Sequence, residues 1–402
     1  MFHLNDRHLV GLRGLLIVAM ALAVPILNGC AGGERADPDF ERSEAFPLPA
    51  GLEDAVTFWR NAYAKWSRNK VIIHDDRHLA LVYQIADLPG PMEESYTSAQ
   101  KEFVRDLKDA WSSRLASLER KVRERGRLKP AEKELKNKID IEGAPGALYG
   151  ASDRVRSQRG VRERFHRGLE NSGAYEQTFR EVFHRHGLPD DLSYLPHVES
   201  SFQLNARSSV GASGMWQFMP ATGRQFMTVN SSVDQRLDPV VAADAAARYL
   251  KNSYSSLRSW PLALTSYNHG LGGMKKAQAR YGNDMARIAA DYDGRYFGFA
   301  SRNFYAEFLA ARHVARNGAR YFPEGVRYRP PLSDQPVVLR DSVTVDEIAR
   351  HYRVPRTVLT DRNYAWLRPV RNGSRAVPAG TTIWLPQGVA RFASGQPRSS
   401  TF

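Results

Sequence analysis

The sequence of 402 residues predicts a mainly helical protein of two or three domains, and three features carry that prediction. Apolar and aromatic residues recur at helical spacing through much of residues 53–140 and 152–186. A capping residue followed by proline, Asp238-Pro239, predicts the start of an alanine-rich helix that runs to about Tyr254. Between residues 336 and 387 the pattern changes to strand, helix, helix, strand, which predicts a small α+β module at the C-terminal end.

The region of residues 51–174 is expected to be helical. The aromatic residues of Phe58–Trp66 fall on one helical stripe, and Leu79–Ile85 gives a second apolar stripe. Stripes of this kind are typical of core-facing helices. From Lys101 to Lys138 charges of both signs alternate around a narrow apolar face, which predicts a solvated amphipathic helix.

His74, Asp75 and Asp76 form the one short cluster of residues that could suggest a metal site. A histidine in a surface turn is the preferred interpretation. No other ligand cluster and no phosphate-binding loop occurs in the sequence, so neither a metal nor another cofactor is expected.

One carboxylate, Glu199, stands among apolar and aromatic residues. Phe202 lies three residues after it, and the nearby segment Gly211–Pro220 adds methionine, tryptophan and phenylalanine. Such surroundings disfavour the charged form and raise the pKa of a carboxyl group, as a general acid requires. Only Arg207 and Arg224 offer nearby positive charge. The chemistry alone leaves two alternatives, a catalytic acid and an inert core glutamate.

The residues around Glu199 also carry a family resemblance. The ordered motif resembles that of the soluble lytic murein transglycosylases, and it reads Glu199-Ser-Ser-Phe202, Ala206-Arg-Ser208, Gly211-Ala-Ser-Gly214, Gln217-Phe-Met-Pro220 and Thr222. A second block, Ala263–Gly270, is similar to the tyrosine-asparagine-x-glycine motif of the same family. The resemblance spans about residues 175–317. Gln203-Leu204 stands where the family usually has asparagine-proline, and this difference affects the expected turn after Phe202 more than the expected chemistry.

The resemblance implies a lysozyme-like, mostly helical catalytic domain, placed here at residues 175–325. It implies an enzyme that cleaves the bond between N-acetylmuramic acid and N-acetylglucosamine in peptidoglycan. Glu199 matches the single catalytic acid, which first protonates the leaving oxygen and then takes a proton from the muramic acid 6-hydroxyl, giving a 1,6-anhydro end without water. The positions that match the family's glycan-lining residues or its second motif are Ser208, Gln217, Met219, Tyr267 and Asn268.

Two alternatives to this activity stay open. A hydrolytic muramidase would need a second carboxylate near Glu199, and Asp190, Asp191 and Asp234 are the candidates in the sequence. The other alternative is a non-catalytic wall adaptor that only binds peptidoglycan.

The C-terminal module follows Pro330-Pro331, and its predicted element order resembles a LysM module, a small glycan-binding domain. The resemblance covers residues 336–387. The usual glycine-aspartate turn is replaced by Arg340-Asp341-Ser342, so a purely structural appendage is the alternative. Residues 388–402 are expected to be disordered.

The N-terminus predicts export and lipid attachment. Leu15–Leu27 is an apolar run of signal-peptide length, too short for a free-standing membrane helix. Leu27-Asn-Gly-Cys30 resembles a bacterial lipobox, which makes residues 1–29 the signal peptide and Cys30, the only cysteine, the lipidation site. Residues 30–50 are expected to be a tether. Neither residue after Cys30 is the aspartate of inner-membrane retention, so the outer membrane, facing the periplasm, is the expected location.

The formal net charge of +14, with a pI near 9.8, allows several anionic partners. No nucleic-acid motif accompanies the scattered basic residues, so nucleic acid is not expected. Peptidoglycan strands and the membrane that holds the lipid anchor are the expected partners, and the sequence assigns no protein partner.

Overall fold

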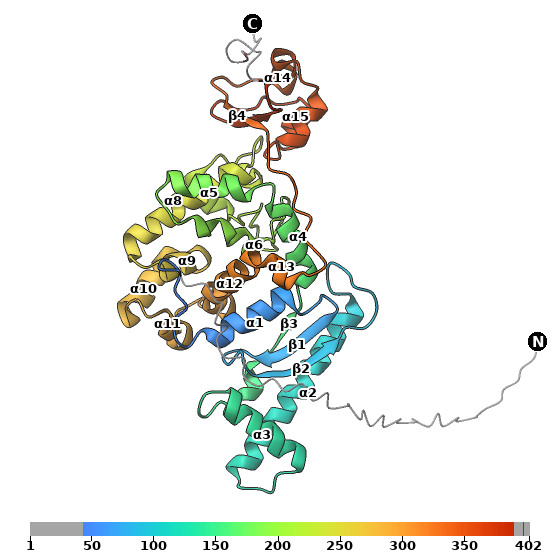
Figure 1. The fold of residues 1–402 in the computed structure, drawn as a ribbon, viewed down its shortest axis with the longest axis vertical. Helices are drawn as coiled ribbons and strands as arrows, with labels where there is room; N and C mark the ends of the chain where they lie inside the picture. The colour runs from blue at the N-terminus through green and yellow to red at the C-terminus, as the bar shows by residue number, and fades with distance from the viewer. Residues whose placement is uncertain (1–42, 390–396, 398–402) are drawn as a thin grey trace, which may run out of the picture. The chain divides into compact units, whose positions relative to one another are not determined.

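The computed structural model describes residues 43–389 and residue 397. The predicted signal peptide, Cys30, most of the tether and most of the C-terminal tail lie outside the described residues. The described part is mainly helical (Figure 1), which confirms the predicted fold class. None of its helices is both long and apolar enough to cross a membrane.

A three-stranded antiparallel sheet interrupts the helices of the N-terminal region. Its strands are β1 (Lys70–Asp75), β2 (Val82–Asp87) and β3 (Val155–Arg159), in the order β2-β1-β3. The prediction that residues 51–174 are helical is therefore wrong for all three strands. The physical reason lies in the β-branched run Val71–Ile73, which is fully buried: Val71 and Ile73 face one core and Ile72 faces the other.

Three helices flank this sheet, α1 (Glu53–Ala64), α2 (Ser98–Arg123) and α3 (Pro130–Glu142). A capping box starts α2, because Thr97 Oγ1 accepts from the backbone N–H of Gln100 while the Gln100 side chain accepts from the backbone N–H of Thr97. The narrow apolar face of α2 buries Leu115 and Leu118. Residues 101–138 thus form two helices, with α3 beginning at Pro130.

The chain from residue 162 to residue 321 is built of helices and connecting loops, with α12 buried at the centre of the larger core. Its helices are α4 (Arg162–Ser172), α5 (Glu176–Arg185), the 3-10 helix η2 (Asp190–Tyr194), α6 (Leu195–Glu199), α7 (Pro220–Phe226), the 3-10 helix η3 (Gln235–Leu237), α8 (Pro239–Leu257), α9 (Trp260–His269), α10 (Leu271–Tyr281), α11 (Met285–Asp291), α12 (Phe299–Arg316) and α13 (Gly318–Tyr321).

Helix α1 shares this larger core although it lies far away in the sequence. It packs against α12, and Trp59 Nε1 donates to Asn303 Oδ1 at 3.4 Å. The N-terminal region and the helices after residue 162 are therefore joined by one continuous apolar core.

The predicted start of α8 is confirmed. The Asp238 side chain accepts from the backbone N–H groups of Val240 and Val241, both at 3.0 Å, and Pro239 takes the first helical position.

The C-terminal module has its own small core. Strand β4 (Gln335–Val338) pairs antiparallel with β5 (Thr382–Leu385), and α14 (Val345–Tyr352), α15 (Arg356–Arg362) and the short α16 (Arg368–Arg371) lie between them in sequence. The strand-helix-helix-strand order is present, with α16 as an addition.

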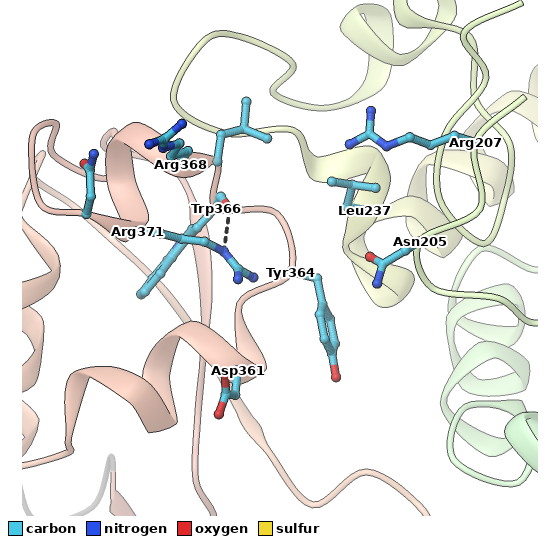
Figure 2. A pocket seen from close by; sticks show the side chains of 10 residues that line it. Asn205, Arg207, Leu237, Asp361, Tyr364, Trp366, Arg368 and Arg371 are labelled. Carbon is cyan, nitrogen blue, oxygen red and sulfur yellow. Dashed lines mark hydrogen bonds between the residues drawn. The ribbon is translucent and has the colours of Figure 1, made fainter. Parts of the chain in front are cut away.

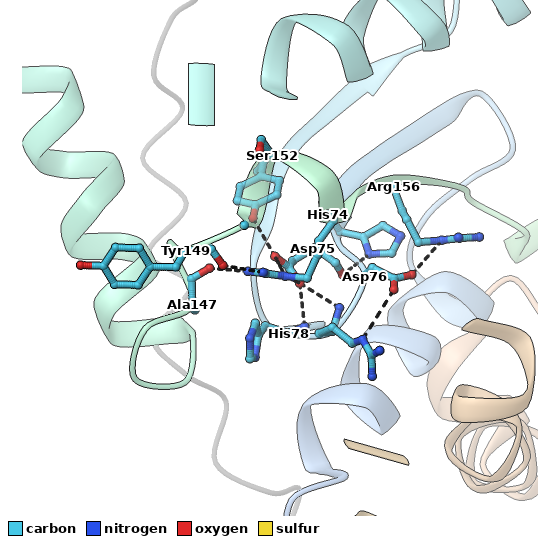
Figure 3. A network of polar contacts seen from close by, with 12 residues as sticks. His74, Asp75, Asp76, His78, Ala147, Tyr149, Ser152 and Arg156 are labelled. Carbon is cyan, nitrogen blue, oxygen red and sulfur yellow. Dashed lines mark hydrogen bonds and ion pairs between the residues drawn. The ribbon is translucent and has the colours of Figure 1, made fainter. Parts of the chain in front are cut away.

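A polar network at the end of β1 replaces the surface turn expected around His74 (Figure 3). His74 is a fully buried strand residue, and burial lowers its pKa to about 4. Asp76 forms ion pairs with Arg156 at 3.4 Å and with Arg302 of α12 at 3.6 Å. The network joins the sheet to the central helix. Among the described residues no group of three histidine, cysteine, aspartate or glutamate side chains could hold a metal ion.

Candidate active site

Glu199 is the last residue of the five-residue helix α6, and the backbone just after it is strained. Ser201 and Phe202 take left-handed conformations, with φ of 53° and 54°. Non-glycine residues in this region are strained and persist where surrounding contacts hold them, often at functional sites. Here Ser200 Oγ donates to Met215 O at 2.8 Å, and the Phe202 ring is buried. These contacts fix the direction in which the Glu199 side chain leaves the helix.

A second carboxyl group, that of Glu307 on α12, acts on Glu199. Burial raises the pKa of Glu199 to about 8, and the negative charge of Glu307 adds to the rise. Burial also raises the pKa of Glu307 to about 8. Both side chains keep partial exposure at the surface. At neutral pH each group therefore holds its proton most of the time.

Neither carboxyl group is neutralised by a neighbour. Within residues 43–389 no group donates a hydrogen bond to Glu199 or Glu307, and no cation pairs with them. Arg164 lies close by, but its Nη2 donates to the carbonyl of Ser200 at 3.3 Å. A carboxyl group with a raised pKa and without a donor is the form that can release a proton to a substrate.

Two tyrosines complete the surroundings of Glu199. Burial raises the pKa of Tyr267 well above its usual value, and the charge of Glu199 adds to the rise. Burial also raises the pKa of Tyr63, and the charges of Glu307 and Glu199 add to the rise. Tyr267 Oη donates to Trp216 O at 2.9 Å, so its proton is directed to the backbone while its oxygen can still accept. Both tyrosines therefore stay neutral beside the carboxyl pair.

The loop after Glu199 is braced by two of the predicted substrate-binding residues. Ser208 Oγ accepts from the backbone N–H of Ala212 at 2.8 Å. Gln217 Nε2 donates to Gly214 O at 2.7 Å and to Ala206 O at 3.3 Å. The hydroxyl proton of Ser208 and the amide oxygen of Gln217 have no assigned partner within the described chain, so each can still contact a ligand.

The remaining predicted site residues lie at the surface. Met219 is 41% exposed just before α7. Asn268, at the end of α9, is exposed, and its Oδ1 accepts from Ser301 Oγ of α12 at 2.7 Å. Asn268 thus links the second sequence motif to the helix that carries Glu307.

Gly214 and Arg236 shape the loop from its inner side. Gly214 has a φ of 79°, and a Cβ at this position would collide with the carbonyl oxygen of Arg236. The buried Arg236 guanidinium donates to Gly211 O at 2.9 Å and to Phe218 O at 3.0 Å, and it pairs with Asp234 at 2.7 Å. The glycine in the motif is therefore required by both backbone conformation and space.

The three aspartates considered as partners for Glu199 are engaged or placed elsewhere. Asp234 pairs with Arg236, and Asp191 pairs with Arg312 at 2.8 Å and Arg316 at 3.0 Å. Asp190 is exposed beside His184. The carboxyl group that does act on Glu199 is Glu307, which the sequence analysis missed. The available signal was a single acidic residue within the otherwise apolar stretch of residues 304–311.

Comparison with known proteins shows that the segment around Glu199 is similar to a known family. Residues 183–289 match the Transglycosylase SLT domain. We call this matching segment the SLT domain. Glu199, Tyr267 and Asn268 lie inside the SLT domain, whereas Tyr63 and Glu307 come from outside the matched residues.

Two relatives resemble part of the chain. Membrane-bound lytic murein transglycosylase D of Escherichia coli K12 is 29% identical over 153 residues, which cover 38% of this chain and 32% of that protein. The same figures hold for the protein of that name in E. coli O6:H1. The chain thus matches about a third of the length of these relatives.

Two solved structures are similar over part of the chain. An inactive mutant of lytic transglycosylase Slt from Pseudomonas aeruginosa gives a TM-score of 0.28 at 22% identity, covering 39% of this chain and 25% of that one. The 70 kDa soluble lytic transglycosylase from E. coli gives 0.30 at 16% identity, covering 56% and 31%.

Proposed function

We propose that this chain is a lytic transglycosylase that cleaves the β-1,4 bond between N-acetylmuramic acid and N-acetylglucosamine in peptidoglycan. The observation that carries the proposal is the carboxyl group of Glu199, which lacks a donor and an ion-pair partner within the described chain, has a pKa raised by burial, and lies in the segment that matches the SLT domain. The motif residues around it belong to the same domain.

The proposed reaction needs one carboxyl group because the substrate supplies the nucleophile. Glu199 gives its proton to the glycosidic oxygen as the bond to the anomeric carbon breaks, and the substrate's N-acetyl group meets the charge on the sugar. The muramic acid 6-oxygen then bonds to the anomeric carbon, and its proton returns to Glu199. The products are a 1,6-anhydro end and a free N-acetylglucosamine hydroxyl, and no water is consumed.

Glu307 bears on the hydrolytic alternative. A hydrolytic muramidase would use a second, ionised carboxylate as nucleophile or as base for water. Burial raises the pKa of Glu307 to about 8, so at neutral pH this group is mostly a neutral acid and a poor base. This favours the transglycosylase over the hydrolase.

Digestion of purified sacculi followed by mass spectrometry tests the proposal. We expect anhydro-muropeptides, each lighter by one water than the hydrolytic product, and no release by Glu199→Gln. Reducing ends would identify a muramidase. Absence of any release from well-digestible sacculi would leave the wall adaptor.

We further propose attachment to the outer membrane through a lipid on Cys30, with the enzyme facing the periplasm. The lipobox-like sequence and the single cysteine support this proposal. Metabolic labelling with a radioactive fatty acid should mark the wild type and leave Cys30→Ala unlabelled. A label on both forms would reject Cys30 as the attachment site.

The C-terminal module is proposed to bind glycan chains, as its LysM-like element order suggests. The module's own role can be measured as retention of inactive Glu199→Gln on sacculi.

A further inference from the structure

A pocket of about 610 Å³ lies where the SLT domain meets the C-terminal module (Figure 2). The SLT side contributes Asn205 and Arg207, and the module contributes Tyr364, Arg368 and Arg371. The volume is within the range of small-ligand sites.

The two walls of this pocket are joined by backbone hydrogen bonds. Val233 forms an antiparallel bridge with Trp366, and its side chain is part of the module's core. Leu367 N donates to Ser232 O at 3.0 Å, and Trp384 Nε1 donates to the Asp238 carboxylate at 2.6 Å. Specific hydrogen bonds between the SLT domain and the C-terminal module therefore hold the two walls of the pocket together.

The pocket carries unneutralised positive charge. Its three arginines face a single acidic residue, Asp361. Arg371 is committed to the module, since it donates to Trp366 O at 2.9 Å and to Thr360 O at 3.1 Å. Arg207 and Arg368 are exposed, and their guanidinium groups make no hydrogen bond or ion pair with any described residue. Two free guanidinium groups on opposite walls suit a carboxylate ligand, which arginine binds in forked geometry.

The SLT wall of the pocket is continuous with the active site. Asn205 and Arg207 belong to the loop that leaves Glu199 and is braced by Ser208 and Gln217. A glycan strand that runs along this loop from Glu199 extends toward Asn205 and Arg207, and every muramic acid of such a strand can carry an anionic stem peptide. The half-buried ring of Tyr364 offers an amphipathic surface in the module wall.

We propose that this pocket binds a carboxylate of a peptidoglycan stem peptide whose glycan strand occupies the Glu199 site. The inference rests on the proposed function, because it takes its ligand from that substrate. It assigns Arg207 and Arg368 to substrate selection, away from the reacting bond.

The test compares affinities in the full chain carrying Glu199→Gln, which removes turnover. The variant Arg207→Gln/Arg368→Gln is matched by Arg120→Gln/Arg127→Gln, which removes the same charge from two exposed arginines in and after α2. The probes are a soluble muropeptide oligomer with stem peptides and a neutral N-acetylglucosamine oligomer with the same number of sugars, both measured by calorimetry.

We expect the pocket variant to bind the muropeptide about tenfold more weakly, the equivalent of one charge-assisted contact. Binding of the neutral oligomer should stay within about twofold, as should both affinities of the control. The charge-preserving variant Arg207→Lys/Arg368→Lys should recover part of the muropeptide affinity.

Unchanged muropeptide affinity would overturn the proposal, as would an equal loss for the neutral oligomer or in the control. So would a variant whose only loss is binding to phosphatidylglycerol vesicles, because that result assigns the pocket to lipid. The readout is binding, so a selective loss would stand even if sacculi yielded no anhydro products. In that case the transglycosylase activity would be rejected, and the assignment of the pocket to a stem-peptide carboxylate would stand.

Discussion

Two acidic side chains of this protein, Asp75 and Glu199, are surrounded in opposite ways. Asp75 ends β1, is fully buried, and accepts from Arg77 N at 2.8 Å, Tyr83 Oη at 3.1 Å and Arg154 Nε at 3.0 Å (Figure 3). Glu199 ends α6 and has no donor among the described residues. Buried carboxylates that serve the fold come with partners, so the unpartnered one is the candidate for chemistry.

The largest effect should come from removing the acid at position 199. We expect Glu199→Gln to lower the release of anhydro-muropeptides at least about a thousandfold, because an amide cannot donate the proton. The free energy of unfolding in urea should stay the same or rise, since no partner loses its contact. If Glu199→Gln lowered the free energy of unfolding as much as the loss of a paired aspartate does, Glu199 would not differ from Asp75 in its role.

The converse substitution is Asp75→Asn. We expect it to lower the free energy of unfolding by about 3 kcal/mol, because Arg154 and the donors around it lose their anion. Asp87→Asn at the end of β2 is the matched control; its pair with Lys70 is exposed, so the expected loss is below about 0.5 kcal/mol. Turnover per folded molecule should be unaffected in both. Impaired turnover in folded Asp75→Asn would mean that the sheet also serves the active site.

The backbone beneath the active site should be the next most sensitive feature. Gly214→Ala has to relieve both a positive φ and a collision with Arg236, and we expect a loss of about 2 kcal/mol in unfolding free energy together with reduced turnover. Gly211→Ala shares the positive φ of 93° but meets open space, so about 1 kcal/mol is expected. Equal losses would show that the close approach to Arg236 is unimportant.

The smallest effect is a change in pH dependence. Glu199 acts in its protonated form, so activity should fall as the pH rises through its pKa of about 8. Glu307→Gln removes a neighbouring negative charge, which lowers the pKa of Glu199 and moves this limb to lower pH by on the order of one unit. The exposed Glu134→Gln on α3 should leave the profile in place. If the limb of the pH profile does not move in Glu307→Gln, then Glu307 does not influence the pKa of Glu199.

Local sequence signals predicted the parts of this fold that depend on neighbours in the chain. The Asp238-Pro239 start of α8 and the element order of the C-terminal module are examples. The strands β1 and β2 were missed because their apolar residues also fit helical spacing, and the β-branched run Val71–Ile73 was the better signal. The segment forms a strand because its apolar side chains are buried on both faces of the sheet.

The candidate site was predicted only in its local half. The motif around Glu199 lies within a short stretch, whereas Glu307 lies more than a hundred residues further along the chain and Tyr63 precedes the matched domain. Their approach to Glu199 follows from the packing of α1 and α12, which no spacing rule encodes. The same holds for Val233, which pairs with Trp366 far along the chain.

The carboxylate of Asp238 serves two neighbours at once, because it caps α8 and also receives the indole N–H of Trp384. Truncation of the chain at Pro330 would therefore remove a contact on which the preceding helical domain depends. The shortened polypeptide would lose a donor to a buried anion and lay bare the side chain of Val233. Such a product should be prone to aggregate. The C-terminal module therefore also protects an apolar part of the SLT domain from solvent.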